Sequence, residues 1–390
     1  MLVKGFKAAA VEAGFKYKNR LDLGIITADA PVAWAGVFTQ SVCRAAPVIW
    51  SSAMAAKGRG RAFLANAGQA NAQTGPAGTK DCYRSAAALA TLLSCPATEI
   101  MLASTGVIGQ PINISILEAK LPNLLSQLRP DGLNDFAQAI LTTDTRPKIR
   151  TEKIKLNGHT VSIWGCAKGS GMIAPNLATM LGFLITDAEI KAPLLRNILV
   201  EGAEMSFNRV TIDGDTSTND SLMIMASGAA GMNPADSGEA LAKFKEASFT
   251  VMKNLAYQIT RDGEGATRLI TIRMRGAKNT EEAKLAARTV AESPLVKTAF
   301  FGGDANWGRL IMALGRSGAT FDPYAIDIDL DDIPWVRQGQ DNNKEKAASM
   351  VMKKTEYGLL INLNAGNGEY EMLTCDFSPK YIAINASYRS

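Results

Sequence analysis

Histidine is nearly absent from this chain, which has one such residue, His159, among 390. It follows Asn157-Gly158, a dipeptide typical of a type I′ turn, and alternating apolar residues flank the turn on both sides. We expect an exposed side chain at the tip of a β-hairpin. A histidine base or a histidine-rich metal site would depend on this one residue, so the base in any catalysis is expected to be another group.

Cysteines and long apolar runs are also scarce. The five cysteines are odd in number and have no C-x-x-C spacing, so neither a disulfide framework nor a zinc site is supported. No apolar run approaches the ~20 residues of a membrane-spanning helix. The N-terminal region lacks the apolar segment of a secretory signal. We expect a cytoplasmic protein without a metal and without a membrane partner.

The charge is nearly balanced, with 42 basic and 37 acidic residues and a net charge of +5. The densest basic stretch, 146–159, alternates charged and apolar residues like the solvent face of a hairpin, so no nucleic-acid partner is expected. A mildly basic chain favours small anionic ligands such as carboxylates or phosphates. The motifs G-x-x-x-x-G-K-S and G-x-G-x-x-G are absent, which excludes a P-loop and a dinucleotide fingerprint.

Helical and strand-like periodicities alternate along the chain. Residues 1–50 predict short strands and turns, including 22–30 and 33–40. The stretch 61–75 is expected to run from a strand into a loop of small residues, and 99–111 is expected to be a strand that enters a turn. The hairpin flanks 153–156 and 160–164 are expected to be strands. Further strands are expected at 180–186, 221–227, 267–276, 296–302, 325–330, 357–364 and 369–377. Helices are expected at 80–94, 114–128, 133–143, 193–208, 238–259, 280–293 and 344–354. This mixture predicts a layered α/β or α+β architecture, with a smaller second lobe at 277–355.

The stretch 165–190 changes character at Thr179. Before it the chain is rich in glycine, and after it comes an apolar run typical of a buried strand. A threonine nucleophile needs a base. Its own α-amino group, with an ordinary pKa of ~7.7–8.0, becomes one once the Ala178–Thr179 bond is broken. Attack of the Thr179 hydroxyl on the Ala178 carbonyl would break it. That Thr179 only begins a strand fits the residues equally well.

Three other stretches could contribute to a site. Thr105-Gly106 stands where a strand is expected to enter a turn, so a hydroxyl and backbone N–H groups could donate to an oxyanion. Glu264, between two glycines, either faces a pocket or belongs to a solvated turn. The acidic stretch 213–220 lacks the ligand spacing of an EF-hand, so a hydrogen-bonded turn is favoured over a metal site.

Taken together, the motifs KGSGMIAPNLATML, STGVIG and DGEGATR resemble the ornithine acetyltransferase family (ArgJ, the bifunctional glutamate N-acetyltransferases). Other stretches match in order along the whole chain: NAGQANAQTG, TTDTRPK, IDGDTSTND, SPLVKTAFFGGDANWGR and CDFSPKYIAINASYRS. The resemblance implies a mixed α/β (α+β) fold with the layered α-β-β-α arrangement of DmpA and ArgJ proteins and a smaller second lobe.

The resemblance also implies self-cleavage between Ala178 and Thr179, giving an α chain of residues 1–178 and a β chain of residues 179–390 in an α2β2 heterotetramer. Thr179 would take acetyl from N2-acetyl-L-ornithine and pass it to L-glutamate in a ping-pong reaction of arginine biosynthesis. No metal or organic cofactor is implied. Acetyl-CoA is a candidate second donor, because members of the family differ in its use.

Site roles follow from the same resemblance. Thr105 and Gly106 match the oxyanion-hole pair. The positions that match substrate contacts are Thr142 or its neighbour Thr143, Lys168, Thr179, Glu264, Asn385 and Ser390. Lys168 would bind an amino-acid carboxylate and Glu264 the ornithine ammonium. The chain departs from many members at Ala174, Leu177 and Ser390, which replace histidine, methionine and threonine. Ser390 keeps a hydroxyl, so little effect on the chemistry is expected.

Two alternatives stay open at this point. A related self-processing aminopeptidase or amidase with an N-terminal nucleophile would use water in place of glutamate as acceptor. The complete set of flanking motifs, Glu264, Asn385 and Ser390 above all, favours the transferase. An unprocessed binding or scaffold protein would instead remain a single chain of 41.5 kDa.

Overall fold

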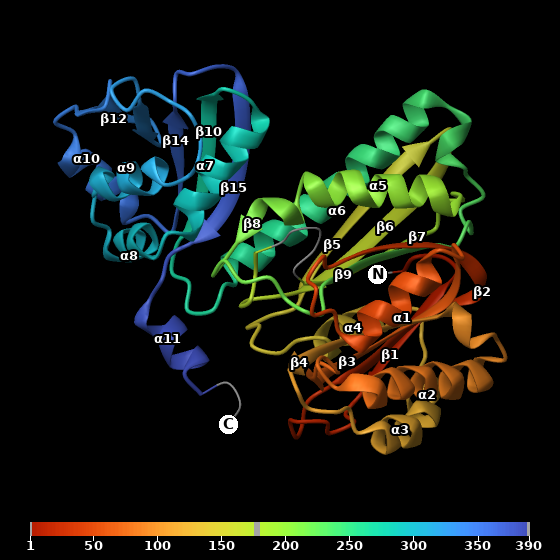
Figure 1. The fold of residues 1–390 in the computed structure, drawn as a ribbon. Coiled ribbons are helices and arrows are strands. Elements are labelled where there is room, and N and C mark those ends of the chain that lie inside the picture. The colour runs from red at the N-terminus through yellow and green to blue at the C-terminus, as the bar shows by residue number, and fades with distance from the viewer. Residues whose placement is uncertain (1, 175–179, 388–390) are drawn as a thin grey trace. The chain divides into compact units, whose positions relative to one another are not determined.

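The computed structural model describes residues 2–174 and 180–387 (Figure 1). They divide into two compact units. The first unit comprises residues 1–169, 175–208 and 216–259, and the second comprises 170–174, 209–215 and 260–390. The predictions for Leu177, Ala178, Thr179 and Ser390 lie outside the described residues. The predicted lobe 277–355 falls within the second unit.

The first unit is built on an eight-stranded sheet with the order β4-β3-β2-β9-β7-β6-β5, in which β1 also pairs with β2. Its strands are β1 (Phe6–Val11), β2 (Leu23–Phe38), β3 (Arg59–Gln69), β4 (Ile100–Val107), β5 (Lys148–Leu156), β6 (His159–Lys168), β7 (Leu181–Thr186) and β9 (Ser221–Ala226). In the middle of the sheet, β7 pairs antiparallel with β6 and parallel with β9. The strand β7 begins two residues after Thr179.

Helices cover this sheet on both faces. Successive residues of a strand point to opposite sides of the sheet, so neighbouring residues of β2 pack in different cores. Ile26 on β2 packs in a core with Phe136, whereas its neighbour Ile25 packs with Leu89 and Leu121. The helices of the unit are α1 (Ala46–Ala55), α2 (Gly75–Leu93), α3 (Ile114–Ser126), α4 (Leu133–Ala139), α5 (Ala192–Glu204) and α6 (Gly238–Arg261). The helix α4 therefore covers one face, and α2 and α3 cover the other.

The second unit has its own sheet, with the order β13-β12-β11-β14-β10-β15-β8. Its strands are β8 (Val210–Thr211), β10 (Leu269–Ala277), β11 (Asp327–Leu330), β12 (Ile333–Arg337), β13 (Gln340–Asp341), β14 (Glu356–Asn362) and β15 (Gly368–Cys375). Its helices are α7 (Thr280–Glu292), α8 (Pro294–Gly302), α9 (Trp307–Gly315), α10 (Glu345–Met352) and α11 (Pro379–Asn385). Small buried residues of α7, such as Ala283 and Ala287, share a core with Ile272 and Met372 of the sheet.

The expected mixed α/β class is confirmed, since two sheets and their helices make up the described chain. The hairpin tip is also confirmed. Asn157 and Gly158 both have positive φ, 46° and 84°, as a type I′ turn requires, and His159 is exposed. No helix in the described part of the chain is long and apolar enough to cross a membrane.

Three local predictions are wrong. The stretch 296–302 forms the helix α8 and not a strand, because Pro294 opens a helix whose buried side includes Val296 and Phe300. The two short strands at 22–30 and 33–40 are one strand of 16 residues, β2. Residues 46–50 begin the helix α1, which has a proline in its first turn.

Candidate functional site

Thr105 and Gly106 lie near the carboxyl end of β4, where the strand pairs with β3. Gly106 has a φ of 129°, which side chains rarely adopt, and it stands opposite Gly68. A Cβ atom at Gly106 would come within 2.2 Å of the Gly68 carbonyl carbon. Only glycine fits such a close approach of two backbones. Because β4 runs to Val107, the pair belongs to the strand and precedes the turn, and Thr105 is 8% exposed.

A network of buried polar side chains supports this strand end. The Asn219 amide donates to the carbonyl oxygens of Ala70 (2.6 Å) and Ser104 (2.8 Å). The Ser104 hydroxyl donates to Asn66 Oδ1 at 2.6 Å. Asn219 belongs to the acidic stretch 213–220. That stretch therefore supplies a hydrogen-bonded turn beside Thr105, as favoured from its composition.

Lys168 is the last residue of β6, and its positive charge influences a buried ion pair. Lys148 Nζ lies 2.6 Å from Asp144 Oδ1, and both side chains are fully shielded from solvent. The same carboxylate accepts the N–H of Gly169 at 2.7 Å and that of Thr142 at 3.2 Å. Burial by itself raises the pKa of Asp144, but the positive charges of Lys148 and Lys168 outweigh it and hold this pKa at about 2. Asp144 thus brings Thr142 and Lys168 into one group.

The second unit brings Glu264 and Asn385 together. Glu264 is only 6% exposed, so it does not belong to a solvated turn. Its Oε2 accepts the side-chain amide of Asn385 at 2.6 Å, and its backbone N–H donates to the Ser170 carbonyl at 2.7 Å. A Cβ atom at Gly171 would lie 2.4 Å from the same Oε2. The glycine of KGSG therefore leaves the space that this carboxylate occupies.

Asp213 anchors the segment 170–174 within the second unit. Its carboxylate accepts the backbone N–H groups of Met172 (2.6 Å) and Ile173 (2.8 Å) and the hydroxyl of Tyr381 (3.2 Å). Burial, followed by the negative charge of Asp213, raises the pKa of Tyr381. Tyr381 also accepts, through its carbonyl, a second hydrogen bond of the Asn385 amide at 3.0 Å. One carboxylate is thus bonded both to α11 and to the segment that precedes the predicted cleavage bond.

The described site residues fall into two sets. Thr105, Gly106, Thr142 and Lys168 belong to the first unit, and Glu264 and Asn385 to the second. Three residues that the sequence did not indicate, Asp144, Asp213 and Tyr381, lie beside these candidate residues or the segment before the predicted cleavage bond. Asp144 and Asp213 could have been suspected, since both are carboxylates inside the motifs TTDTRPK and IDGDTSTND. Tyr381 carries no comparable signal.

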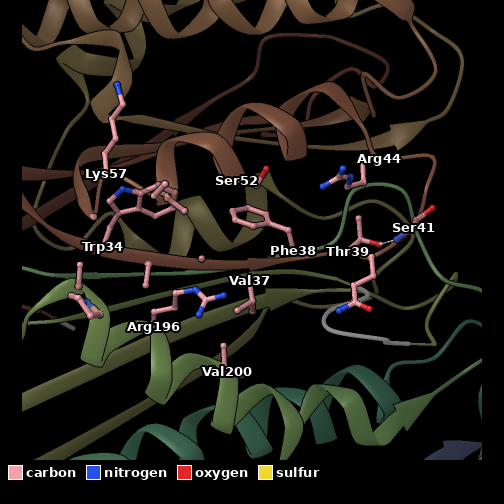
Figure 2. A pocket seen from close by; sticks show the side chains of 18 of the residues that line it. Trp34, Val37, Phe38, Thr39, Ser41, Arg44, Ser52, Lys57, Arg196 and Val200 are labelled. Atoms are coloured by element: carbon pink, nitrogen blue, oxygen red, sulfur yellow. Dashed lines mark hydrogen bonds between the residues drawn. The ribbon is translucent and has the colours of Figure 1, made fainter.

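A separate cavity of about 970 Å³ lies in the first unit beside β2, α1 and α5 (Figure 2). Trp34 and Phe38 of β2 line it, and Arg44, Lys57 and Arg196 are exposed cations at its wall. None of the predicted site residues that the structure describes lines this cavity. It is therefore a feature apart from the two sets of candidate residues.

Comparison with known proteins places the chain in a family. Residues 7–390 match the family model described as "ArgJ family". The arginine biosynthesis bifunctional protein ArgJ of Desulfotalea psychrophila is 46% identical over 393 residues, with 100% of each chain covered. That of Chlorobaculum tepidum is 46% identical over 390 residues, covering 99% of this chain and 96% of the relative. The crystal structure of the Bacillus halodurans protein aligns with a TM-score of 0.50 at 40% identity, covering 53% of this chain and 98% of that chain. This chain belongs to the ArgJ family.

Proposed function

We propose that this protein is an arginine-biosynthesis acyltransferase, which moves acetyl from N2-acetyl-L-ornithine to L-glutamate through an ester on Thr179. The observation that carries this proposal is the environment of Glu264. Its carboxylate is buried, and its side-chain partner among the described residues is the neutral amide of Asn385. A neutral amide does not neutralise a carboxylate as an arginine or lysine would, so this site suits a cationic ligand, and the ammonium group of an ornithine side chain is one.

The proposed cycle begins with maturation. The Thr179 hydroxyl attacks the Ala178 carbonyl carbon, the peptide C–N bond breaks, and water hydrolyses the resulting ester. The products are a chain ending at Ala178 and a chain beginning at Thr179, which stay together in an α2β2 assembly. The new α-amino group of Thr179 then acts as the base for its own hydroxyl.

Acetyl transfer follows in two half-reactions. Thr179 attacks the acetyl carbonyl of acetylornithine, ornithine leaves, and the acetyl ester passes to the amine of glutamate. The negative oxygen of each tetrahedral intermediate would be bound by the Thr105 hydroxyl and the Gly106 backbone N–H. Lys168 would bind a substrate carboxylate, and Thr142 and Ser390 would complete the contacts. The cycle uses no metal or organic cofactor, and acetyl-CoA is a candidate second donor.

The assay that tests this proposal compares two acceptors. The purified protein is incubated with N2-acetyl-L-ornithine and L-glutamate, and both acetylglutamate and free acetate are measured. Acetylglutamate should form much faster than acetate. Predominant release of acetate would favour the self-processing aminopeptidase or amidase, and acetylglutamate formation from acetyl-CoA would establish the second donor.

A further inference from the structure

The cavity beside β2 has room for a ligand much larger than the two amino acids of the proposed cycle. It lies within the first unit, between the second half of β2, α1 and α5 (Figure 2). Its volume of about 970 Å³ is at the upper end of the range for small-molecule sites, about 300–1,000 Å³. Its lining residues have no role in the transfer from acetylornithine, so its ligand has to be identified from the chemistry of its walls.

The wall of the cavity carries charge of one sign. Arg44 precedes α1, Lys57 follows it, and Arg196 lies on α5. All three are exposed, and their side chains have no hydrogen bond or ion pair with other described residues. Among the described residues that line the cavity there is no aspartate or glutamate. Three uncompensated cations on three different segments favour a ligand with several negative charges.

The amino end of α5 adds to this positive field. Ala192 and Pro193, the first two residues of the helix, line the cavity. The first turn, all of which the structure describes, has neither an acidic residue nor a side-chain cap. A helix N-terminus carries about half a positive charge and binds phosphate groups. The end of α5 therefore favours the same anionic ligand as the three cations.

The backbone of β2 offers further donors to the cavity. The strand β3 pairs with β2 only as far as Ala33, whereas β9 pairs with it as far as Phe38. The edge opposite β9 thus has no strand partner within the described chain beyond Trp34, whose N–H donates to the carbonyl of Gly58, just before β3. Every second residue of a strand directs its N–H to the same edge. The N–H groups of Gly36 and Phe38 therefore face this open edge, where both residues line the cavity.

Aromatic surface accompanies these donors. A Cβ atom at Gly36 would lie 2.7 Å from the ring of Phe38 and 3.3 Å from that of Trp34. The glycine therefore makes room for two rings on one side of the strand. Phe38 is half-buried and lines the cavity, so a planar base can pack against its ring. Phosphate groups and a planar base together describe the nucleotide end of a cofactor.

One end of the cavity adjoins the strand end that carries the proposed oxyanion pair. Phe38 and Ile108 pack against the same small apolar cluster, and Ile108 is the second residue after Gly106. Thr39, the next wall residue, donates its hydroxyl to the carbonyl of Ser217 at 2.9 Å. Ser217 belongs to the turn that supports the same strand end. A long ligand held in the cavity can thus extend to this strand end without leaving the first unit.

We propose that the cavity binds the phosphate-bearing end of acetyl-CoA, as the second acetyl donor. This inference rests on the proposed function, in which acetyl-CoA is a candidate donor. CoA carries its phosphates and adenine at one end and its thioester at the end of a flexible arm. The phosphates contact Arg44, Lys57 and Arg196, and the adenine packs on Phe38. The arm then extends towards Gly106.

The transfer from this donor follows the same course as that from acetylornithine. The hydroxyl oxygen of Thr179 forms a bond to the acetyl carbonyl carbon, and the C–S bond breaks. The hydroxyl proton passes through the α-amino group of Thr179 to the sulfur, so CoA leaves as the thiol. The acetyl ester is the one that acetylornithine forms, and glutamate accepts the acetyl group in the same second half-reaction.

Titration calorimetry with CoA tests this site. CoA replaces acetyl-CoA so that no transfer occurs during the titration. Arg44→Gln and Arg196→Gln each remove one charge, so each should raise the dissociation constant about 10-fold or more. The double variant should bind more weakly than either. ADP, which shares the nucleotide end, should compete with CoA, whereas pantetheine, which lacks the phosphates, should not.

Arg316→Gln is the matched control. Arg316 is also exposed, belongs to the second unit, and has no side-chain partner among the described residues. This variant should bind CoA with the parental dissociation constant. In steady-state assays with acetyl-CoA and glutamate, the KM for acetyl-CoA should rise in the cavity variants only.

The outcomes separate this site from the proposed function. A parental protein that makes acetylglutamate from acetylornithine but does not bind CoA would overturn the site and leave the proposed function standing. Equal affinity for CoA in the parent and the double variant would place CoA elsewhere. Binding of CoA and ADP without acetylglutamate formation from acetyl-CoA would mean a site for free nucleotides and would overturn the donor role. Failure to transfer acetyl from acetylornithine would refute the proposed function and this role with it.

Discussion

Asn385 donates its side-chain amide to Glu264 Oε2 at 2.6 Å, although 121 positions of sequence separate the two residues. The bond fixes the direction of a carboxylate that is almost fully buried. It also connects α11 to the glycine-rich loop that carries Glu264. Two residues singled out as substrate contacts are thus one structural group.

Glu264→Gln should weaken the use of acetylornithine while the fold is kept. Glutamine retains an oxygen that can accept from Asn385, but it loses the negative charge that would bind the ornithine ammonium. The KM for N2-acetyl-L-ornithine should rise about 10- to 100-fold. Steady-state kinetics measure this change. An unchanged KM would show that Glu264 does not bind the ammonium group.

Gly106→Ala should disrupt the strand end that carries the oxyanion pair. The added Cβ would lie 2.2 Å from a backbone carbon of Gly68, and neither backbone can move without breaking the pairing of β3 and β4. We expect a loss of more than about 3 kcal/mol in the free energy of unfolding, measured with urea. The control is Gly158→Ala, where φ is also positive but no atom lies within 4 Å. It should cost only about 1 kcal/mol, and equal losses in both variants would contradict the steric account.

Asp144→Asn should remove an acid-sensitive part of the stability. The pKa of Asp144 in the folded protein, about 2, is lower than the ordinary aspartate value of 3.8. A lowered pKa stabilises the folded state above the unfolded-state pKa, and this contribution is lost as pH falls from about 4 towards about 2. Urea unfolding over that range should show a smaller pH dependence for the variant. A slope equal to that of the parent would exclude Asp144 as its source.

A second stability measurement tests Lys148, the partner of Asp144 in the buried ion pair. At neutral pH, Asp144→Asn leaves Lys148 buried without its counter-charge and should cost about 3–5 kcal/mol. Adding Lys148→Met should recover part of this loss, because neither charge of this buried pair then remains. A double variant that is less stable than Asp144→Asn would contradict this account.

Asp213→Ala should release the segment that precedes the predicted cleavage bond. The backbone N–H groups of Met172 and Ile173 lose their acceptor, so their hydrogen exchange should accelerate. Tyr381→Phe is the control. It removes one hydroxyl but keeps both backbone hydrogen bonds of Asp213, and the aromatic ring stays stacked on that of Phe377, with 4.8 Å between the ring centroids. Amide exchange measured by mass spectrometry should change in the first variant only. Equal acceleration in both would mean that Asp213 does not anchor the segment.

Local patterns in the sequence predicted most of the fold. The Asn157-Gly158 turn is correct because a type I′ turn depends on the φ angles of two adjacent residues. The apolar stretch 296–302 was assigned to a strand because short apolar runs fit either structure. Pro294, which opens the helix there, was the overlooked signal.

The candidate site was harder to predict, because its partners are distant in sequence. The motifs indicated Lys168 and Thr142, but not that Asp144 joins them through the Thr142 and Gly169 N–H groups. Likewise, the stretch 213–220 was considered only as a metal loop or a polar turn. In the structure, Asp213 accepts hydrogen bonds from the segment 170–174, and Asn219 donates one to the Ser104 carbonyl. These tertiary contacts cannot be read from the spacing of residues in the sequence.

The central claim is that one hydroxyl, that of Thr179, performs both self-cleavage and acetyl transfer. Intact-mass spectrometry of the purified protein, incubated with N2-acetyl-L-ornithine, tests it most directly. We predict two chains, of which the one beginning at Thr179 gains the mass of one acetyl group and loses it when L-glutamate is added. Thr179→Ala should remain a single uncut chain and acquire no acetyl group. An active protein that persists as one uncut chain of 41.5 kDa, or an acetyl group on the other chain, would contradict the account.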